Sequence, residues 1–191
     1  MYKIVTAPTS AQIATFLPMK DIRYALNFQG DGIGQPVDDT SKTRLAALRD
    51  VAYFNIERQY LQRAILTQTW DYFTDAWENT FELAYPPMAS VTHVKYYDSD
   101  NALQTATANT DYRANVSEYL GKVEMINTFS LYDRDDAINI QFIAGVAYGS
   151  VDQRIKEAIL EKLFALYNKE DRDGTILNLI GDMIVYYEPE L

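Results

Sequence analysis

The fold is decided by residues 38–97, which read DDTSKTRLAALRDVAYFNIERQYLQRAILTQTWDYFTDAWENTFELAYPPMASVTHVKYY. From Thr43 to Leu61 nothing in this stretch breaks a helix. From Leu66 onward the residues are mostly strand formers, such as Thr, Trp, Tyr and Phe. The stretch therefore joins a helical part of the chain to a β part.

The helix expected from Thr43 to Leu61 is apolar on two sides. The face expected to enter the core carries apolar residues three or four apart: Leu45, Leu48, Ala52 and Ile56. Ala47, Phe54 and Leu61 fall on nearly the opposite side, where a monomer's surface helix would be polar. Either a second layer of the same domain or a neighbouring subunit would cover that side. The remaining strip, expected to be solvated, consists of Arg44, Arg49, Asp50, Glu57 and Arg58.

The segment before this helix is expected to hold little regular structure. Residues 1–15 show no sustained period and predict an extended arm, and Pro18 suits the first turn of a short helix ending near Asn27. The glycine-rich segment from Gly30 to Pro36 predicts a loop, with Thr40 or Ser41 as the cap of the long helix. The loop does not match the spacing of a phosphate-binding motif, and no strand precedes it.

The β part should contain seven strands. They are expected over 67–74, 80–84, 91–97, 103–105, 112–116, 122–125 and 138–142. A hairpin turn is predicted at 98–101, and the last strand should stop at Gly145. Because the gaps are too short for the crossovers of parallel strands, the sheet should be antiparallel and local in order.

Helical spacing resumes at Ser150, where Ser-Val-Asp-Gln has the spacing of a capping box. The buried stripe of this helix should be Ile155, Ala158, Ile159, Lys162, Leu163, Leu166 and Tyr167. A last short helix is expected over 176–184, and the tail 186–191 has no partner visible in the sequence. The predicted fold class is α+β, mainly a helical bundle with an inserted antiparallel β-sheet or hairpin lobe. The single domain 1–191 would comprise helical parts at about 16–65 and 150–185, a β lobe at about 66–145, and the tail.

Composition limits the possible functions. The formal net charge of -10 opposes binding to nucleic-acid phosphates, so DNA could pass near the protein without specific binding. The chain has no cysteine, which excludes disulfides and thiolate metal sites. No apolar run approaches the length of a membrane span, and the first residues lack a signal-peptide core, so a soluble, unprocessed protein is expected. The 15 tyrosines favour assembly, although strand positions would explain about half of them.

A catalytic constellation is hard to find in this sequence. His93 is the only histidine and lies within a predicted strand, so a structural role is expected and no Ser-His-Asp or Cys-His site can form without it. The acidic clusters around Asp135 and Asp171 predict solvated loops. The segment from Asp98 to Asn101 begins like a calcium loop but lacks its glycine and its final acid. We therefore expect no enzyme activity, no cofactor and no metal.

Several of these pieces occur together, in the same order, in the head-tail connector proteins of tailed phages. This adaptor or head-completion family has relatives in gene transfer agents, and the resemblance covers roughly residues 38–168. The pieces are Asp38, Asp39, Glu57, Tyr60, 63–70 (RAILTQTW), 85–87 (YPP), 90–92 (SVT), 96–98 (YYD), 111–113 (DYR), 121–123 (GKV), 140–145 (IQFIAG), 151–160 and Tyr167. No single piece is diagnostic, but the ordered set is fairly specific.

The resemblance implies a structural virion protein that forms a homo-oligomeric ring, typically of twelve subunits, below the portal. Such a ring extends the DNA channel and docks the next neck, stopper or tail component, and its subunits would be assembled in the host cytoplasm. Under this interpretation Ala47, Phe54 and Leu61 contact the neighbouring subunit. Copies of a chain with net charge -10 repel one another at low salt, so a portal template would help the ring to close.

The tail would be a second contact. Residues 182–191 are expected to be mobile in the isolated chain and to become ordered on the portal through Tyr186, Tyr187 and Leu191. Alternatively, the two tyrosines fold back on the protein's own sheet. Two other function classes stay open, a small carboxylate-based hydrolase and a monomeric binding module. The hydrolase would need two acids converging in a pocket.

Overall fold

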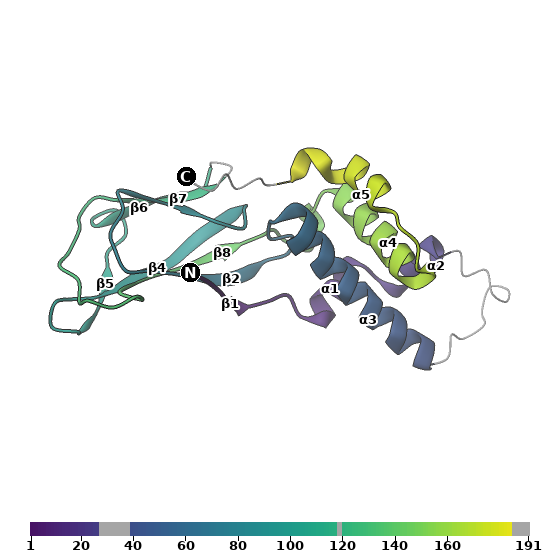
Figure 1. Ribbon diagram of the computed structural model, residues 1–191, viewed down its shortest axis with the longest axis horizontal. Helices are drawn as coiled ribbons and strands as arrows, with labels where there is room; N and C mark the ends of the chain where they lie inside the picture. The colour runs from purple at the N-terminus through teal and green to yellow at the C-terminus, as the bar shows by residue number, and fades with distance from the viewer. Residues whose placement is uncertain (27–38, 118–119, 185–191) are drawn as a thin grey trace. The chain divides into compact units, whose positions relative to one another are not determined.

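The computed structural model describes residues 1–26, 39–117 and 120–184 (Figure 1). The chain divides into two compact units. We call Met1–Ala7 with Arg63–Ala147 the β unit, and Pro8–Gln62 with Tyr148–Leu191 the helical unit. The expected α+β class is confirmed. Within the described residues, no helix is both long enough and apolar enough to cross a membrane.

The β unit contains two antiparallel sheets. The five-stranded sheet has the order β1 (Tyr2–Thr6), β2 (Gln68–Thr74), β8 (Ile138–Ala144), β4 (Met88–Tyr97) and β5 (Leu103–Ala106). The three-stranded sheet has the order β3 (Thr80–Leu83), β7 (Gly121–Met125) and β6 (Tyr112–Asn115). All seven expected strands are present close to their predicted bounds.

The expected local strand order is wrong, because β8 lies between β2 and β4. Every second residue of β8 is buried, from Ile138 to Ala144, and the residues between them are half-buried. A strand with this pattern is stabilised most at the centre of a sheet, where both of its edges are paired. Gly145 ends β8 as expected, at φ +85°, and a Cβ there would lie 2.2 Å from the Leu66 carbonyl oxygen.

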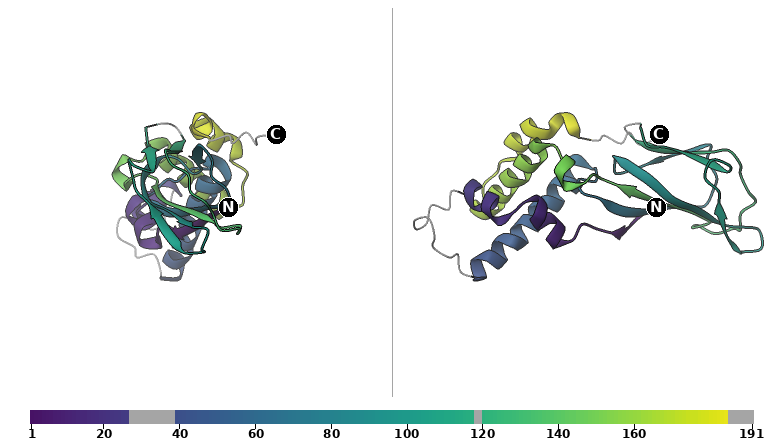
Figure 2. Two further views of the ribbon diagram at one scale, coloured as in Figure 1. Left: turned by 90° about the vertical axis from the view of Figure 1, so that its left-hand side faces the viewer. Right: turned by 180° about the vertical axis from the view of Figure 1, so that it is seen from behind.

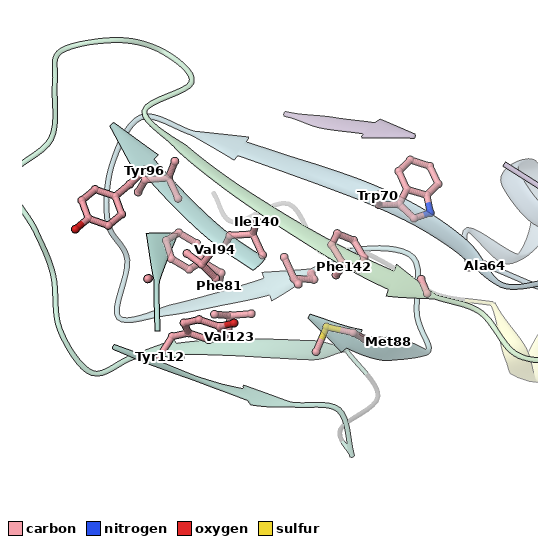
Figure 3. Packing of buried hydrophobic residues seen from close by; sticks show 14 residues of the cluster. Ala64, Trp70, Phe81, Met88, Val94, Tyr96, Tyr112, Val123, Ile140 and Phe142 are labelled. Carbon is pink, nitrogen blue, oxygen red and sulfur yellow. The ribbon is translucent and has the colours of Figure 1, made fainter. Parts of the chain in front are cut away.

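The core of the β unit lies between the two sheets (Figure 3). Phe81, Val123 and Tyr112 from the smaller sheet pack with Val94 and Ile140 from the larger one. Other members of the same cluster are Trp70, Leu83, Met88, Tyr96, Ile138 and Phe142. Trp70 on β2 belongs to this cluster, and Trp77, which follows the end of β2, packs against it.

The helical unit contains five α-helices in its described residues. They are α1 (Ser10–Phe16), α2 (Met19–Ala25), α3 (Asp39–Asn55), α4 (Gln153–Asn168) and α5 (Asp173–Ile180). A π-helical turn η1 (Ile56–Leu61) continues α3, and short 3-10 turns η2 (Tyr148–Ser150) and η3 (Gly181–Met183) flank α4 and α5. Helix α4 packs against both α3 and α5, and α2 also contacts it (Figures 1 and 2).

The ends of the chain differ most from expectation. The extended arm predicted for residues 1–15 is found only in β1. Residues 10–16 form helix α1 instead, with a capping box between Thr9 and Gln12. Helix α2 follows Pro18 as expected, with Ile22 buried and Tyr24 exposed. Helix α4 begins at Gln153 with Asp152 as its cap, so the expected start at Ser150 is wrong. The predicted loop from Gly30 to Pro36 lies outside the described residues.

Candidate functional site

The exposed side of α3 is the candidate site. Arg44, Ala47, Val51 and Arg58 are exposed and Phe54 is half-buried. At 100° per residue the four positions from Arg44 to Phe54 fall within one narrow sector of α3, and Arg58 in the following turn lies over the ring of Phe54. We call this set the α3 stripe. It is apolar in the middle and basic at both ends, and the buried residues Leu45, Ala52 and Ile56 lie on the other side of the helix.

Leu61 does not belong to the α3 stripe, because it is fully buried inside the chain. The cause is η1, in which the backbone adopts the π form from Ile56 to Leu61. A π turn closes its hydrogen bonds five residues apart instead of four, so each residue rotates less about the axis. Leu61 therefore reaches the buried side. The interface hypothesis is left with Ala47 and Phe54, to which the structure adds Val51.

Two charged residues expected in the solvated strip, Arg49 and Glu57, are buried instead. The Arg49 guanidinium donates to the Ser10 carbonyl oxygen at 3.1 Å, to Ser10 Oγ at 2.9 Å and, through Nε, to Asp50 Oδ1 at 2.8 Å. Tyr53 donates its hydroxyl to Glu57 Oε2 at 2.8 Å. Arg49 thus joins α3 to the start of α1. These bonds hold the inner side of α3 in place beneath the stripe.

A polar cluster of Tyr60, Lys162 and Asp173 connects η1 to α4 and α5. The Tyr60 hydroxyl donates to Asp173, and Lys162 Nζ lies 2.9 Å from that hydroxyl and 3.1 Å from Asp173 Oδ1. Burial raises the pKa of Tyr60, and its bond to Asp173 adds to the rise. The bonds from Tyr60 and Lys162 hold the pKa of Asp173 below its usual value. Burial alone would lower the pKa of Lys162, but the bonds to Tyr60 and Asp173 outweigh it and raise that pKa.

Two sets of residues considered for catalysis, His93 and the acidic residues around Asp135, lie in the β unit. His93 lies on β4, where its Nε2 is 2.9 Å from the side-chain oxygen of Asn139 on β8. A depression of about 510 Å³ in the β unit brings together Asp75, Asp135 and Asp136. Of these, Asp136 has its pKa lowered by its bond to Arg134, which is opposite to the shift of a general acid. In residues 1–26, 39–117 and 120–184, no group of three His, Cys, Asp or Glu could hold a metal.

The Asp98 turn is organised by its own carboxylate. Asp98 accepts from the backbone N–H of Asp100 and of Ala102, and from the Gln104 amide at 2.7 Å. The bond from Gln104, with that from Ala102, lowers the pKa of Asp98. This is the hairpin expected between β4 and β5. The predicted portal contacts Tyr186, Tyr187 and Leu191 lie outside the described residues.

Comparison with solved structures finds the same fold in chains of gene transfer agent (GTA) particles. One chain from the virion of a native GTA particle is 19% identical with a TM-score of 0.74. One from the neck of an empty GTA particle, computed with C6 symmetry, is also 19% identical with a TM-score of 0.75. A third, from the neck of a native GTA particle computed with C12 symmetry, is 16% identical with a TM-score of 0.68. Each match covers 99% of this chain and 97% of the other.

Because the sequence identities are low, these matches show a shared fold and nothing more. No protein-family model matches the chain, and no curated protein matches it in sequence. Because the matches extend over nearly all of both chains, the two units occur together in the GTA chains as they do here. Sequence reasoning missed Val51, although its spacing from Ala47 and Phe54 is the same helical spacing that identified those two residues.

Proposed function

We propose that the protein is a structural component of the neck of a tailed-phage-like particle, a head-tail connector that forms a homo-oligomeric ring below the portal. The observation that carries the proposal is the match of the whole fold to GTA chains, including chains from particle necks. The C6 and C12 symmetry of those neck structures suits a ring of twelve subunits. The ring would extend the DNA channel and dock the next neck, stopper or tail protein.

The α3 stripe supplies a surface for subunit contact in this proposal. Val51 is 48% exposed and lies between Ala47 and Phe54, so the stripe presents apolar area to solvent in the described chain. An exposed apolar strip bordered by charged residues is typical of protein interaction sites. The net charge of -10 supports a channel through which DNA slides without binding. The tail residues Tyr186, Tyr187 and Leu191 would contact the portal.

Native mass spectrometry of the purified chain, alone and with its portal, tests the function. We expect a ring, or a ring that forms only on the portal, and a chain that remains monomeric under both conditions would contradict the proposal. Val51→Asp should abolish the ring while leaving a folded monomer, because it places a charge in the middle of the α3 stripe. Phe54→Asp should do the same with some loss of stability, because Phe54 also packs on Tyr53 with ring centroids 5.2 Å apart.

The portal contact needs its own test. Deletion of residues 186–191 should leave the melting temperature of the free chain unchanged and abolish portal attachment. A lower melting temperature with normal attachment would show that the tail belongs to the protein's own fold.

A further inference from the structure

Helix α5 presents a second exposed face with an apolar centre. Leu177 is 45% exposed, and Gly174 and Asn178 lie beside it at helical spacing, whereas Ile176 and Ile180 are fully buried. Acidic residues border this face, with Asp171 before the helix and Asp182 after it. We call Asp171, Gly174, Leu177, Asn178 and Asp182 the α5 face. It combines an apolar centre with acidic ends.

The α3 stripe and the α5 face do not cover each other in the described chain. Helices α3 and α5 both pack against α4 (Figures 1 and 2), and Val51 on α3 and Leu177 on α5 are both exposed. The two surfaces therefore stay open to contact with another molecule. Two different surfaces on one chain are what a head-to-tail contact between copies requires.

The charges of the two surfaces are complementary. In the described part of the chain, Arg44 and Arg58 form no ion pair and contact only the rings of Tyr167 and Phe54, at 5.6 Å and 4.8 Å. Asp171 likewise has no cation partner there and accepts only the N–H of Asp173. Asp182 shares Arg154 with Asp152, so that group of three keeps one net negative charge. Basic ends on one surface thus correspond to acidic ends on the other.

The charged residues have a similar spacing along the chain on the two surfaces. Arg44 and Arg58 are 14 residues apart, and Asp171 and Asp182 are 11 residues apart. An antiparallel approach would bring Arg58 to Asp171 and Arg44 to Asp182, with the apolar centres between them.

We propose that the α3 stripe of one subunit packs on the α5 face of the next copy of this chain, which makes the ring contact heterologous. This proposal rests on the homo-oligomeric function proposed above. Val51 with Ala47 and Phe54 would meet Leu177, and Arg44 and Arg58 would meet Asp171 and Asp182. Since every subunit carries both surfaces, the contact propagates and closes into a ring when the rotation per subunit fits.

The absence of cysteine allows a direct test by cross-linking. Three proteins are prepared: the single variants Val51→Cys and Leu177→Cys, and the double variant that carries both substitutions. Each protein, and an equal mixture of the two single variants, is treated with a short bismaleimide. Neither single variant should cross-link with itself, an equal mixture should give one covalent dimer, and the double variant should give a ladder of oligomers. The matched control is Val51→Cys with Thr175→Cys, because Thr175 is exposed on a different side of α5 and should cross-link far less.

A charge exchange provides the second measurement. Arg58→Glu should reduce assembly at least tenfold, and Arg58→Glu combined with Asp171→Arg should restore most of it. Self-cross-linking of Val51→Cys alone would show an α3-to-α3 contact and overturn the proposal. A wild-type chain that assembles while the mixture fails to cross-link would overturn this pairing only, whereas a wild-type chain that never assembles contradicts the proposed function itself.

Discussion

The β unit and the helical unit bury their side chains in different ways. In the β unit, residues alternate along β8 between the core and the other sheet face, and an apolar cluster from both sheets fills the interior. In the helical unit, Arg49 and Glu57 are buried under α3, and no other charged side chain in the described chain is buried. The outer side of α3 meanwhile leaves Val51 exposed.

This difference separates stability from assembly. The apolar cluster of the β unit is enclosed by its two sheets, and Val5 on β1 and Leu103 on β5 lie outside that cluster and are exposed. The helical unit needs specific polar bonds to position α3 and presents an apolar and basic stripe outward. Mutations in the β core should therefore act on folding, and mutations in the α3 stripe on association.

The largest effect is expected from Phe142→Ala in the central strand β8. Phe142 is fully buried between the two sheets, so the substitution leaves a cavity in the apolar cluster. The free energy of unfolding should fall by about 3–5 kcal/mol, as measured by urea denaturation. Val5→Ala on the exposed side of β1 is the control and should have little effect. Equal losses in both variants would mean that this cluster is not the core of the unit.

A smaller effect is expected from Arg49→Ala in the helical unit. The substitution removes the bonds to Ser10 and leaves Asp50 without its ion pair at 2.6 Å, so unfolding should become easier by about 2–3 kcal/mol. Arg49→Met keeps most of the volume and separates packing from hydrogen bonding. If Arg49→Met is as stable as the wild type, the polar bonds do not position α3 and the contrast between the units disappears.

The sequence predicted the strands well because alternation is a local signal. Each of the seven expected strands was found, but their distribution over two sheets and the central place of β8 were not predicted. Strand order depends on which faces pack together, and spacing along the chain does not contain that information. Helix α1 was missed although Thr9 and Gln12 have the capping-box spacing.

The candidate site was predicted in part. The spacing of Ala47 and Phe54 identified the outer side of α3 correctly, and Val51 follows from the same periodicity. Leu61 was misplaced because periodicity assumes an uninterrupted α-helix, and no residue between Ile56 and Leu61 signals a π turn. Burial of Arg49 could not be predicted either, since its partner Ser10 lies 39 residues away in the sequence.

A modest and pH-dependent effect is expected from Asp173→Asn, which weakens the attachment of α5. The Asp173 side chain is 54% exposed, so the loss should stay below about 1 kcal/mol at neutral pH. Its pKa is depressed in the folded state, so its stabilisation is present above the unfolded pKa of about 3.9 and is lost as the pH falls below that value. The variant and the wild type should therefore become equally stable in acid.

Urea denaturation at several pH values measures this difference. Glu157→Gln on the exposed side of α4 serves as the control, because Glu157 has no ion pair among the described residues. A difference that persists unchanged well below pH 3 would contradict the assignment to the Asp173 carboxylate.

The smallest effect is expected from an insertion in the β unit, Gly-Ser placed after Ser99 in the turn between β4 and β5. Ser99 and Asp100 are exposed, and the bonds of Asp98 to Ala102 and Gln104 lie at the surface, so water can replace them. Loop closure costs only about 0.6 kcal/mol for each doubling of loop length, so the melting temperature should change little. Ring formation should also be unaffected, because this turn belongs to the β unit and the α3 stripe to the helical unit. Thermal melting and native mass spectrometry measure the two properties on one sample. Loss of the ring with unchanged melting would place a subunit contact at this turn, and the division between a unit for folding and a unit for assembly would then be wrong.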